Sequence, residues 1–162
     1  MAVFFHTTIK TPVGFLELKS DEESLVSVGF VNQQNSSSPE LPDIIDEAAK
    51  QLHEYFKGER KFFDLNINPE GTLFQHKIWD LVKNVPYGTT VSYLDIARFS
   101  GNEKNTRAVG MANGKNPLPI IIPCHRVIGH AGKLTGYAGG LEKKQWLLHL
   151  ELQHEKPAGL LF

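Results

Sequence analysis

The sequence contains a single cysteine, Cys124, among its 162 residues. One cysteine cannot form an intramolecular disulfide, and it cannot supply a zinc site built on several cysteines. The seven histidines show no metal-ligand spacing either, so we expect no metal. An unpaired cysteine fits a reducing compartment. We therefore expect a cytoplasmic protein.

Long apolar runs are also missing from the chain. No stretch approaches the roughly 18 apolar residues of a membrane span, and no basic-then-apolar signal segment opens the sequence. Hydrophobic residues make up 41% of the chain, which is enough to bury a core. This composition indicates a soluble globular monomer of one ordinary domain or two small ones, with no membrane contact.

The chain has little net charge, but its charges are unevenly distributed. Residues 1–71 carry 6 Lys and Arg against 12 Asp and Glu, whereas residues 72–133 carry 8 against 3. A basic half joined to an acidic half suggests that the second half alone meets a polyanion. Modest basicity is also common on surfaces that bind nothing.

The first half is predicted to form a small sheet with one helix. Residues 3–9 and 15–19 flank a Pro-Gly turn, and residues 25–31 form a third strand candidate in an antiparallel meander. Between residues 42 and 57, apolar side chains recur at helical spacing. We expect this helix to cover the sheet. Residues 66–71 are the predicted linker, and no residue before them is a candidate for a catalytic role.

The second half is predicted to be mostly helical. Thr72 and Gln75 form a capping-box pattern at the start of a helix, and Ser92 and Asp95 form another. A short turn at residues 100–102 then leads to a third helix over about 105–114. Helix, short glycine turn, helix is typical of a helix-turn-helix, although unrelated helical pairs imitate it.

The third helix has few side chains that reach base edges. It contains Ala108, Gly110, Ala112 and Gly114, and its long or polar residues are Arg107, Asn113 and Lys115. A major-groove reader normally presents several long polar side chains, so this composition favours close approach to the minor groove. Tight helix packing would use small residues equally well. Arg107 favours DNA, because an arginine there could fill the stack when a base leaves it.

Cys124 is either a buried core residue or a nucleophile. Pro123 precedes the thiol, and His125 and Arg126 place positive charge beside it, which packing alone does not require. The local composition predicts an extended segment, in which the side chains of Cys124 and His125 would point to opposite faces. A water molecule would then have to carry the thiol proton to His125. Glu151, among apolar residues near the end of a helix predicted over 141–152, is our candidate carboxylate to orient that histidine.

The glycine-rich stretch from 129 to 140 follows the cysteine segment and contains Tyr137. Glycines allow close backbone approach, and Tyr137 offers a ring face and a hydroxyl group. This stretch forms either one wall of a pocket or an ordinary surface turn.

These motifs resemble the O6-alkylguanine-DNA alkyltransferases. The resemblance covers the second half nearly end to end, and its motifs are Phe74-x-x-x-Ile78-Trp79, Pro86-Tyr87-Gly88, Ser92-Tyr93, Arg107-Ala108-Val109-Gly110, Asn116-Pro117, Pro123-Cys124-His125-Arg126-Val127 and Tyr137-x-Gly139-Gly140-Leu141. It implies an α+β chain with a ribonuclease-H-like sheet-plus-helix domain over residues 1–70. A winged helix-turn-helix domain carrying the cysteine is implied over residues 71–162.

The resemblance also implies a role for each motif residue. Cys124 would be the alkyl acceptor, with His125 as its proton acceptor through water and Glu151 as the carboxylate behind it. Arg107 would take the place of the flipped base in the stack, and Tyr93 would help rotate the nucleotide outward. Further contacts to double-stranded DNA would come from Ala108, Gly110, Asn113 and Lys115. Residues at the substrate are Tyr93, the hinge Asn116, Val127, Tyr137, which hydrogen-bonds O6, and Ala138, where some members carry serine.

The implied reaction is a single-turnover transfer of the alkyl group from O6-alkylguanine, and from O4-methylthymine, to Cys124 without a cofactor. The base would first be flipped out of the duplex through the minor groove. A cysteine hydrolase and a sequence-reading transcription regulator are rival interpretations. A nearer alternative is a non-enzymatic alkyltransferase-like protein, in which tryptophan replaces the acceptor cysteine.

Overall fold

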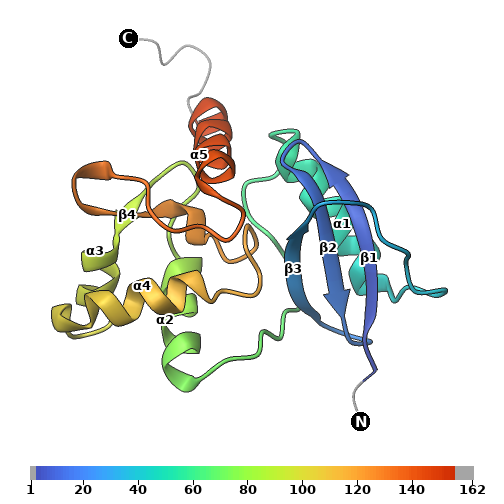
Figure 1. Cartoon of the computed structure of the whole chain (residues 1–162), viewed down its shortest axis with the longest axis horizontal. Coiled ribbons are helices and arrows are strands. Elements are labelled where there is room, and N and C mark those ends of the chain that lie inside the picture. The colour runs from blue at the N-terminus through green and yellow to red at the C-terminus, as the bar shows by residue number, and fades with distance from the viewer. Residues whose placement is uncertain (1–2, 156–162) are drawn as a thin grey trace. The chain divides into compact units, whose positions relative to one another are not determined.

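The computed structural model describes residues 3–155, which form two compact units that divide between Glu70 and Gly71. The first unit is a sheet with one helix, and the second is mostly helical (Figure 1). The α+β class and this order of units confirm the sequence prediction.

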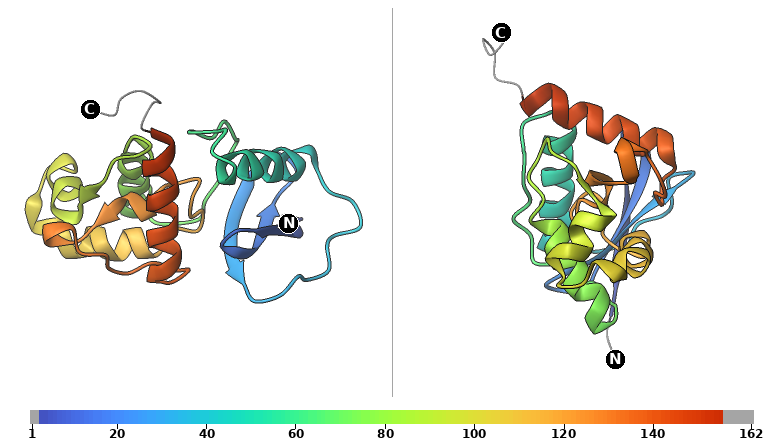
Figure 2. Two further views of the ribbon diagram at one scale, coloured as in Figure 1. Left: turned by 90° about the horizontal axis from the view of Figure 1, so that it is seen from above. Right: turned by 90° about the vertical axis from the view of Figure 1, so that its left-hand side faces the viewer.

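The first unit is built on an antiparallel sheet in the order β1-β2-β3. Its elements are β1 (Phe5–Thr11), β2 (Gly14–Ser20), β3 (Leu25–Val31) and the helix α1 (Asp43–Phe56). The first strand lies two residues later than predicted, because the hairpin continues until Thr11 pairs with Gly14. Helix α1 lies along one face of the sheet (Figure 2), where Leu16, Leu18, Ile45 and Leu52 are buried.

The second unit consists of short helices around the cysteine segment. Its elements are α2 (Leu73–Lys83), β4 (Val91–Ser92), α3 (Tyr93–Phe99), η1 (Glu103–Asn105), α4 (Thr106–Gly114), η2 (Cys124–Arg126), β5 (Val127–Ile128), η3 (His130–Gly132) and α5 (Leu141–Glu155). Both predicted capping boxes are present, at the starts of α2 and α3. The helix-turn-helix prediction corresponds to α3 and α4.

Packing inside the second unit brings distant parts of the sequence to the cysteine. The Trp79 indole on α2 donates a hydrogen bond of 2.8 Å to the Ala112 carbonyl on α4. Strands β4 and β5 pair in parallel, Val91 with Val127, so the start of α3 lies beside the residues that follow Cys124. None of the helices within residues 3–155 has the length and apolar run needed to cross a membrane.

Candidate active site

The cysteine segment is helical rather than extended. Cys124, His125 and Arg126 form the 3-10 helix η2, and all three residues are buried. Successive side chains of a 3-10 helix are about 120° apart, so those of Cys124 and His125 do not point to opposite faces. The prediction of an extended segment was therefore wrong at this point.

Side chains from α4 and the residues after it hold this helical turn in place. Asn113 donates a hydrogen bond to the Cys124 carbonyl at 3.3 Å, and Asn116 donates one to the Ile122 carbonyl at 2.8 Å. These carbonyls would bond a neighbouring strand if the segment were extended. Ile120, just upstream, has a φ of 76°, a conformation that a β-branched residue rarely adopts. Asparagine contacts and this bend together explain why a strand-like composition forms a turn.

Glu151 lies at the centre of a buried polar cluster. Its Oε2 atom lies 2.5 Å from Nε2 of His125, and the Arg126 guanidinium donates to both carboxylate oxygens, at 2.8 and 3.0 Å. The backbone N–H of Gly88 donates to Oε1 at 3.2 Å. The structure thus joins the predicted pair His125 and Glu151, and it adds Arg126 as a bidentate partner.

The charges of this cluster follow from these contacts. Burial alone would raise the pKa of Glu151, but the hydrogen bonds and charges of His125 and Arg126 lower it to about 2. Burial lowers the pKa of His125, and the cations Arg126 and Lys144 act in the same direction, although Glu151 opposes them. We therefore assign an ionised Glu151 and a neutral His125 at rest.

This assignment fixes the tautomer of His125. An ionised carboxylate only accepts hydrogen bonds, so Nε2 of His125 carries the hydrogen and donates it to Glu151. The other ring nitrogen, Nδ1, then holds a lone pair and can accept a proton. This is the arrangement that a general base requires.

The thiol of Cys124 is neutral at rest. Its burial raises its pKa to about 11, although a hydrogen bond from Asn116 and the charge of Lys144 oppose that shift. The sequence places His125 and Arg126 directly after Cys124. Because the Arg126 guanidinium binds Glu151 instead, the thiol has to lose its proton during the reaction.

Tyr93 and Tyr137 are the two tyrosines that the sequence assigned to the substrate site. Burial, with the negative charges of Cys124 and Glu151, raises the pKa of Tyr137 well above 10, so its phenol stays protonated. The Tyr93 hydroxyl contacts Thr135 twice, at 3.4 Å to its carbonyl and 3.2 Å to its hydroxyl. Tyr137 can therefore donate a hydrogen bond through its phenol, and Tyr93 connects α3 to the loop that carries Tyr137.

Comparison with known proteins identifies the family. The family profile described as 6-O-methylguanine DNA methyltransferase, DNA binding domain, matches residues 73–153, and its ribonuclease-like domain matches residues 4–69. A methylated-DNA–protein-cysteine methyltransferase from Methanosarcina acetivorans is 47% identical, with 91% of this chain and 97% of that protein covered. The chain belongs to the 6-O-methylguanine DNA methyltransferase family.

Other members of the 6-O-methylguanine DNA methyltransferase family agree with this assignment. The constitutive methylated-DNA–protein-cysteine methyltransferase of Bacillus subtilis is 44% identical, over 91% of this chain and 94% of its own. The crystal structure of Mycobacterium tuberculosis O6-methylguanine methyltransferase superposes with a TM-score of 0.87 at 41% identity, covering 98% of both chains. The crystal structure of the M. tuberculosis protein in complex with DNA superposes with a TM-score of 0.84 at 42% identity. It covers 94% of this chain and 95% of that one.

In this member of the family, one face of α4 is open to solvent. It presents five exposed residues along the helix and just beyond it, namely Arg107, Ala108, Met111, Gly114 and Lys115. Gly110 is half-buried instead, and a Cβ added to it would lie 3.8 Å from the Tyr93 ring. Arg107, Ala108 and Lys115 thus share a surface, as DNA contacts require.

The side chain of Asn113 does not lie on the surface where it was predicted. Its side chain is 3% exposed and hydrogen-bonded to the Cys124 carbonyl, so it faces the cysteine segment and not a DNA surface. Met111, by contrast, is 65% exposed on the surface that Asn113 was expected to join. Helical spacing alone would have placed Met111 with Arg107, which lies four residues before it.

The remaining predicted substrate residues lie around the cysteine segment. Val127 is fully buried, and its carbonyl oxygen accepts a hydrogen bond from Lys144. Ala138 is exposed in the loop beside Tyr137. Their contacts with a substrate remain predictions.

Sequence reasoning missed Arg126 as the partner of Glu151, and it missed Lys144 entirely. The buried stripe of α5 contains Lys144, Leu147, Leu150 and Glu151. Two charged residues in line with two buried leucines were the available signal. Trp146, on the same helix, is 36% exposed.

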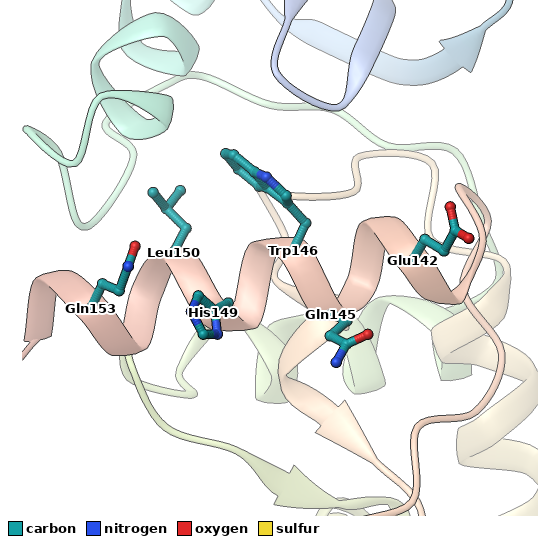
Figure 3. Close-up of a pocket in the computed structure, with 6 residues that line it drawn as sticks. All are labelled: Glu142, Gln145, Trp146, His149, Leu150 and Gln153. Atoms are coloured by element: carbon teal, nitrogen blue, oxygen red, sulfur yellow. The ribbon is translucent and has the colours of Figure 1, made fainter.

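A hollow of about 340 Å³ lies against α5 and does not include the cysteine segment. Its lining residues are Glu142, Gln145, Trp146, His149, Leu150 and Gln153, with Trp146 and Leu150 projecting from the same side of the helix (Figure 3). None of the predicted site residues borders this hollow. The chemistry therefore belongs to the surroundings of Cys124.

Proposed function

We propose that the protein repairs DNA by transferring the alkyl group of O6-alkylguanine to the sulfur of Cys124. The bond between O6 and the alkyl carbon breaks while the bond between sulfur and that carbon forms. The thiol proton passes to Nδ1 of His125, with a water as carrier, and the departing guanine oxygen receives a proton from Tyr137. Once the His125 imidazolium has returned its proton to the Tyr137 phenolate through solvent, the net result moves one proton from thiol to guanine and needs no cofactor.

The observation that carries this proposal is the chain of contacts behind the thiol. The single cysteine adjoins a neutral histidine whose Nε2 is bound to an ionised carboxylate, which is itself held by Arg126. When His125 takes up a proton, Glu151 stabilises the imidazolium that forms. A cysteine that only fills a core needs no such arrangement.

Access of a DNA base to this buried thiol requires that the base leave the duplex. We propose that α4 enters the minor groove, that Arg107 fills the gap in the stack and that Tyr93 helps rotate the nucleotide outward. Asn116 would hold α4 against the cysteine segment, consistent with its hydrogen bonds to the Ile122 carbonyl and the Leu118 N–H. O4-methylthymine, whose alkyl group is also on an exocyclic oxygen, is the second proposed substrate.

Each chain is expected to act once. A thioether is a poor leaving group, and no second nucleophile among the described residues adjoins Cys124 to remove the alkyl group. Duplex DNA carrying radiolabelled O6-methylguanine should therefore label Cys124, and the plateau should lie near one methyl group per chain.

The matched control is Cys124→Ser, which should bind the duplex and accept no label. Turnover beyond one methyl group per chain would show that Cys124 is not a terminal acceptor. Binding of the lesion without any transfer by the unmodified protein would favour the non-enzymatic, alkyltransferase-like alternative.

A further inference from the structure

The exposed face of α4 continues beyond the helix at both ends. Lys104, in η1, precedes Ala108 by four residues. Met111 follows Ala108 by three residues, and Lys115 follows Met111 by four. Residues at these spacings lie on one face of a helix, and all four are exposed. They form a ridge, here called the α4 ridge, with a lysine at each end and two uncharged side chains between.

The backbone that carries Lys104 is held by side chains of the turn between α3 and α4. Asn102 accepts a hydrogen bond from the Lys104 N–H at 2.9 Å, and the Thr106 hydroxyl donates one to the Glu103 carbonyl at 2.7 Å. Both α3 and α4 pack against η1. The turn therefore places the Lys104 side chain at a defined position directly before α4.

Other cations of the helix-turn-helix are bound within the protein. Lys77 donates a hydrogen bond of 2.8 Å to the backbone carbonyl at the end of α3. The Nε atom of Arg98 lies 3.2 Å from a carboxylate oxygen of Glu103, so the acidic residue next to Lys104 is already paired. Within residues 3–155, no ion pair joins Lys104 or Lys115 to a carboxylate. These two lysines are available to an anion from outside.

The charge and length of the α4 ridge fit the phosphates of duplex DNA. Helix α4 contains no acidic residue, and Arg107 adds a third exposed cation beside the ridge. A helix of nine residues is about 14 Å long, whereas the minor groove is about 6 Å wide. The ends of a helix that enters this groove therefore meet the phosphates that border it, while Ala108 and Met111 face the groove between them.

We propose that Lys104 and Lys115 bind backbone phosphates of duplex DNA at the two ends of α4 and so hold this helix over the minor groove. The partner, duplex DNA, is the one on which the proposed function rests. Lys104 lies outside the motifs of the family resemblance and becomes a DNA-binding residue. Phosphate contacts position a protein without reading bases, so these two contacts do not require the lesion.

The test measures the affinity of the full chain for an undamaged duplex at a series of salt concentrations. Lys104→Gln and Lys115→Gln each remove one charge and keep a polar side chain, whereas Lys104→Arg retains the charge. Lys83→Gln, at an exposed position at the end of α2, is the matched control for loss of a lysine charge.

The expected result follows from the release of counterions. Each phosphate contact contributes about 0.9 to the slope of log affinity against log salt concentration. Lys104→Gln should therefore flatten the slope by about 0.9, and the double variant with Lys115→Gln by about 1.8. Near 0.1 M salt, one lost contact should weaken binding roughly 5- to 10-fold. Lys104→Arg and Lys83→Gln should keep the slope of the unmodified protein.

Two results would overturn the inference for Lys104. One is an unchanged slope in Lys104→Gln, and the other is an equal flattening in Lys83→Gln, which would show that net charge alone is responsible. Thermal unfolding and reaction with free O6-benzylguanine report on the fold of each variant. A loss of either in Lys104→Gln that matches its loss of DNA affinity would assign Lys104 to the fold instead.

A second measurement locates the contacts from the side of the DNA. Neutral methylphosphonates replace the phosphates of the duplex one at a time, and the affinity of each duplex is measured. At the phosphate that Lys104 binds, this replacement should weaken the unmodified protein and leave the affinity of Lys104→Gln unchanged. A second phosphate should show the same dependence on Lys115. If every replacement weakened variant and unmodified protein equally, neither lysine would bind a phosphate.

These measurements are separate from alkyl transfer, because they use undamaged DNA. If the unmodified protein took no alkyl group from O6-methylguanine while the slopes changed as expected, the phosphate contacts would stand and the proposed function would fall. Transfer of one methyl group per chain together with an unchanged slope in Lys104→Gln would have the reverse meaning.

Discussion

Glu151 shows how a single residue combines structural and chemical work. Its two oxygens receive hydrogen bonds from His125, Arg126 and the Gly88 N–H, all inside the protein. An unpaired buried carboxylate would be costly, so these donors keep the group ionised. Because Arg126 holds the carboxylate, Glu151 fixes the orientation of His125 without taking its proton.

Replacement of Glu151 by glutamine should impair the proton transfer from Cys124. Glu151→Gln removes the charge that stabilises the imidazolium, so transfer should slow by roughly 10- to 1000-fold at neutral pH. The deficit should shrink as pH rises, because hydroxide then removes the thiol proton. The measurement is a pH-rate profile with free O6-benzylguanine, which needs no DNA binding.

His125→Ala should show a similar profile, and the double variant should be little worse than either single one, since members of one relay are not additive. A Glu151→Gln profile that coincides with that of the unmodified protein at every pH would leave Glu151 with a structural role alone.

Arg107 should matter for duplex DNA and not for the free base. Its side chain is exposed on α4, away from the buried cluster. If it occupies the gap left by the extruded base, Arg107→Ala should lose a few kcal/mol of support for flipping and slow repair in duplex DNA. The rates with duplex DNA and with free O6-benzylguanine are compared, and Lys83→Ala controls for the lost charge. Equal losses on both substrates would mean that Arg107 supports the fold.

Helix α4 connects the proposed DNA-facing surface to the cysteine segment. Its exposed face carries Arg107, Ala108 and Met111, while Asn113 on the opposite side hydrogen-bonds the Cys124 carbonyl. The helix is nine residues long, which corresponds to about 14 Å. Small side chains on the exposed face let the backbone come close to a groove.

The small side chains on the exposed face of α4 predict that a larger residue at Ala108 would obstruct DNA binding. Ala108→Leu adds bulk at an exposed position, so the fold should be unaffected while approach to DNA is obstructed. Affinity for duplex DNA should fall by at least about 10-fold, equivalent to about 1.4 kcal/mol. Binding is measured at constant salt, and thermal unfolding and reaction with free O6-benzylguanine serve as controls. Unchanged affinity would place the DNA surface elsewhere.

At the scale of the whole molecule, the buried cluster makes stability depend on pH. The folded pKa of Glu151 is about 2 against its ordinary 4.5, and burial lowers that of His125 below 6.5. In both cases the unfolded chain binds protons that the folded chain does not. Stability should therefore fall as pH drops below 6.5, and fall further between 4.5 and 2.

The contribution of Glu151 to this loss should be on the order of 3 kcal/mol. Urea unfolding between pH 7 and pH 3 measures it, with Glu151→Gln as the comparison. The variant should be less stable at pH 7 and should show a flatter dependence below pH 4.5. An equally steep dependence in the variant would assign the acid sensitivity to other groups.

Local sequence determined the secondary structure wherever the signal lies within a few residues. The capping boxes at Thr72 and Ser92, the apolar spacing of α1 and the β3 strand at residues 25–31 all appear as predicted. Cap hydrogen bonds and amphipathic periodicity are contacts between near neighbours, so they can be recognised before the chain folds. The candidates Cys124, His125 and Glu151 also came from the sequence.

Tertiary structure alone decided how these residues work together. The turn at Cys124 depends on Asn113 and Asn116, the bidentate contact joins Arg126 to a helix that begins fifteen residues later, and Lys144 reaches carbonyls on two other segments. Protonation states depend on burial, which a list of residues does not contain. The sequence by itself indicated Cys124 as the candidate acceptor and His125 as its candidate proton acceptor. The fold decided that the thiol is neutral at rest and that Asn113 faces inward, because both depend on burial and on contacts between different segments.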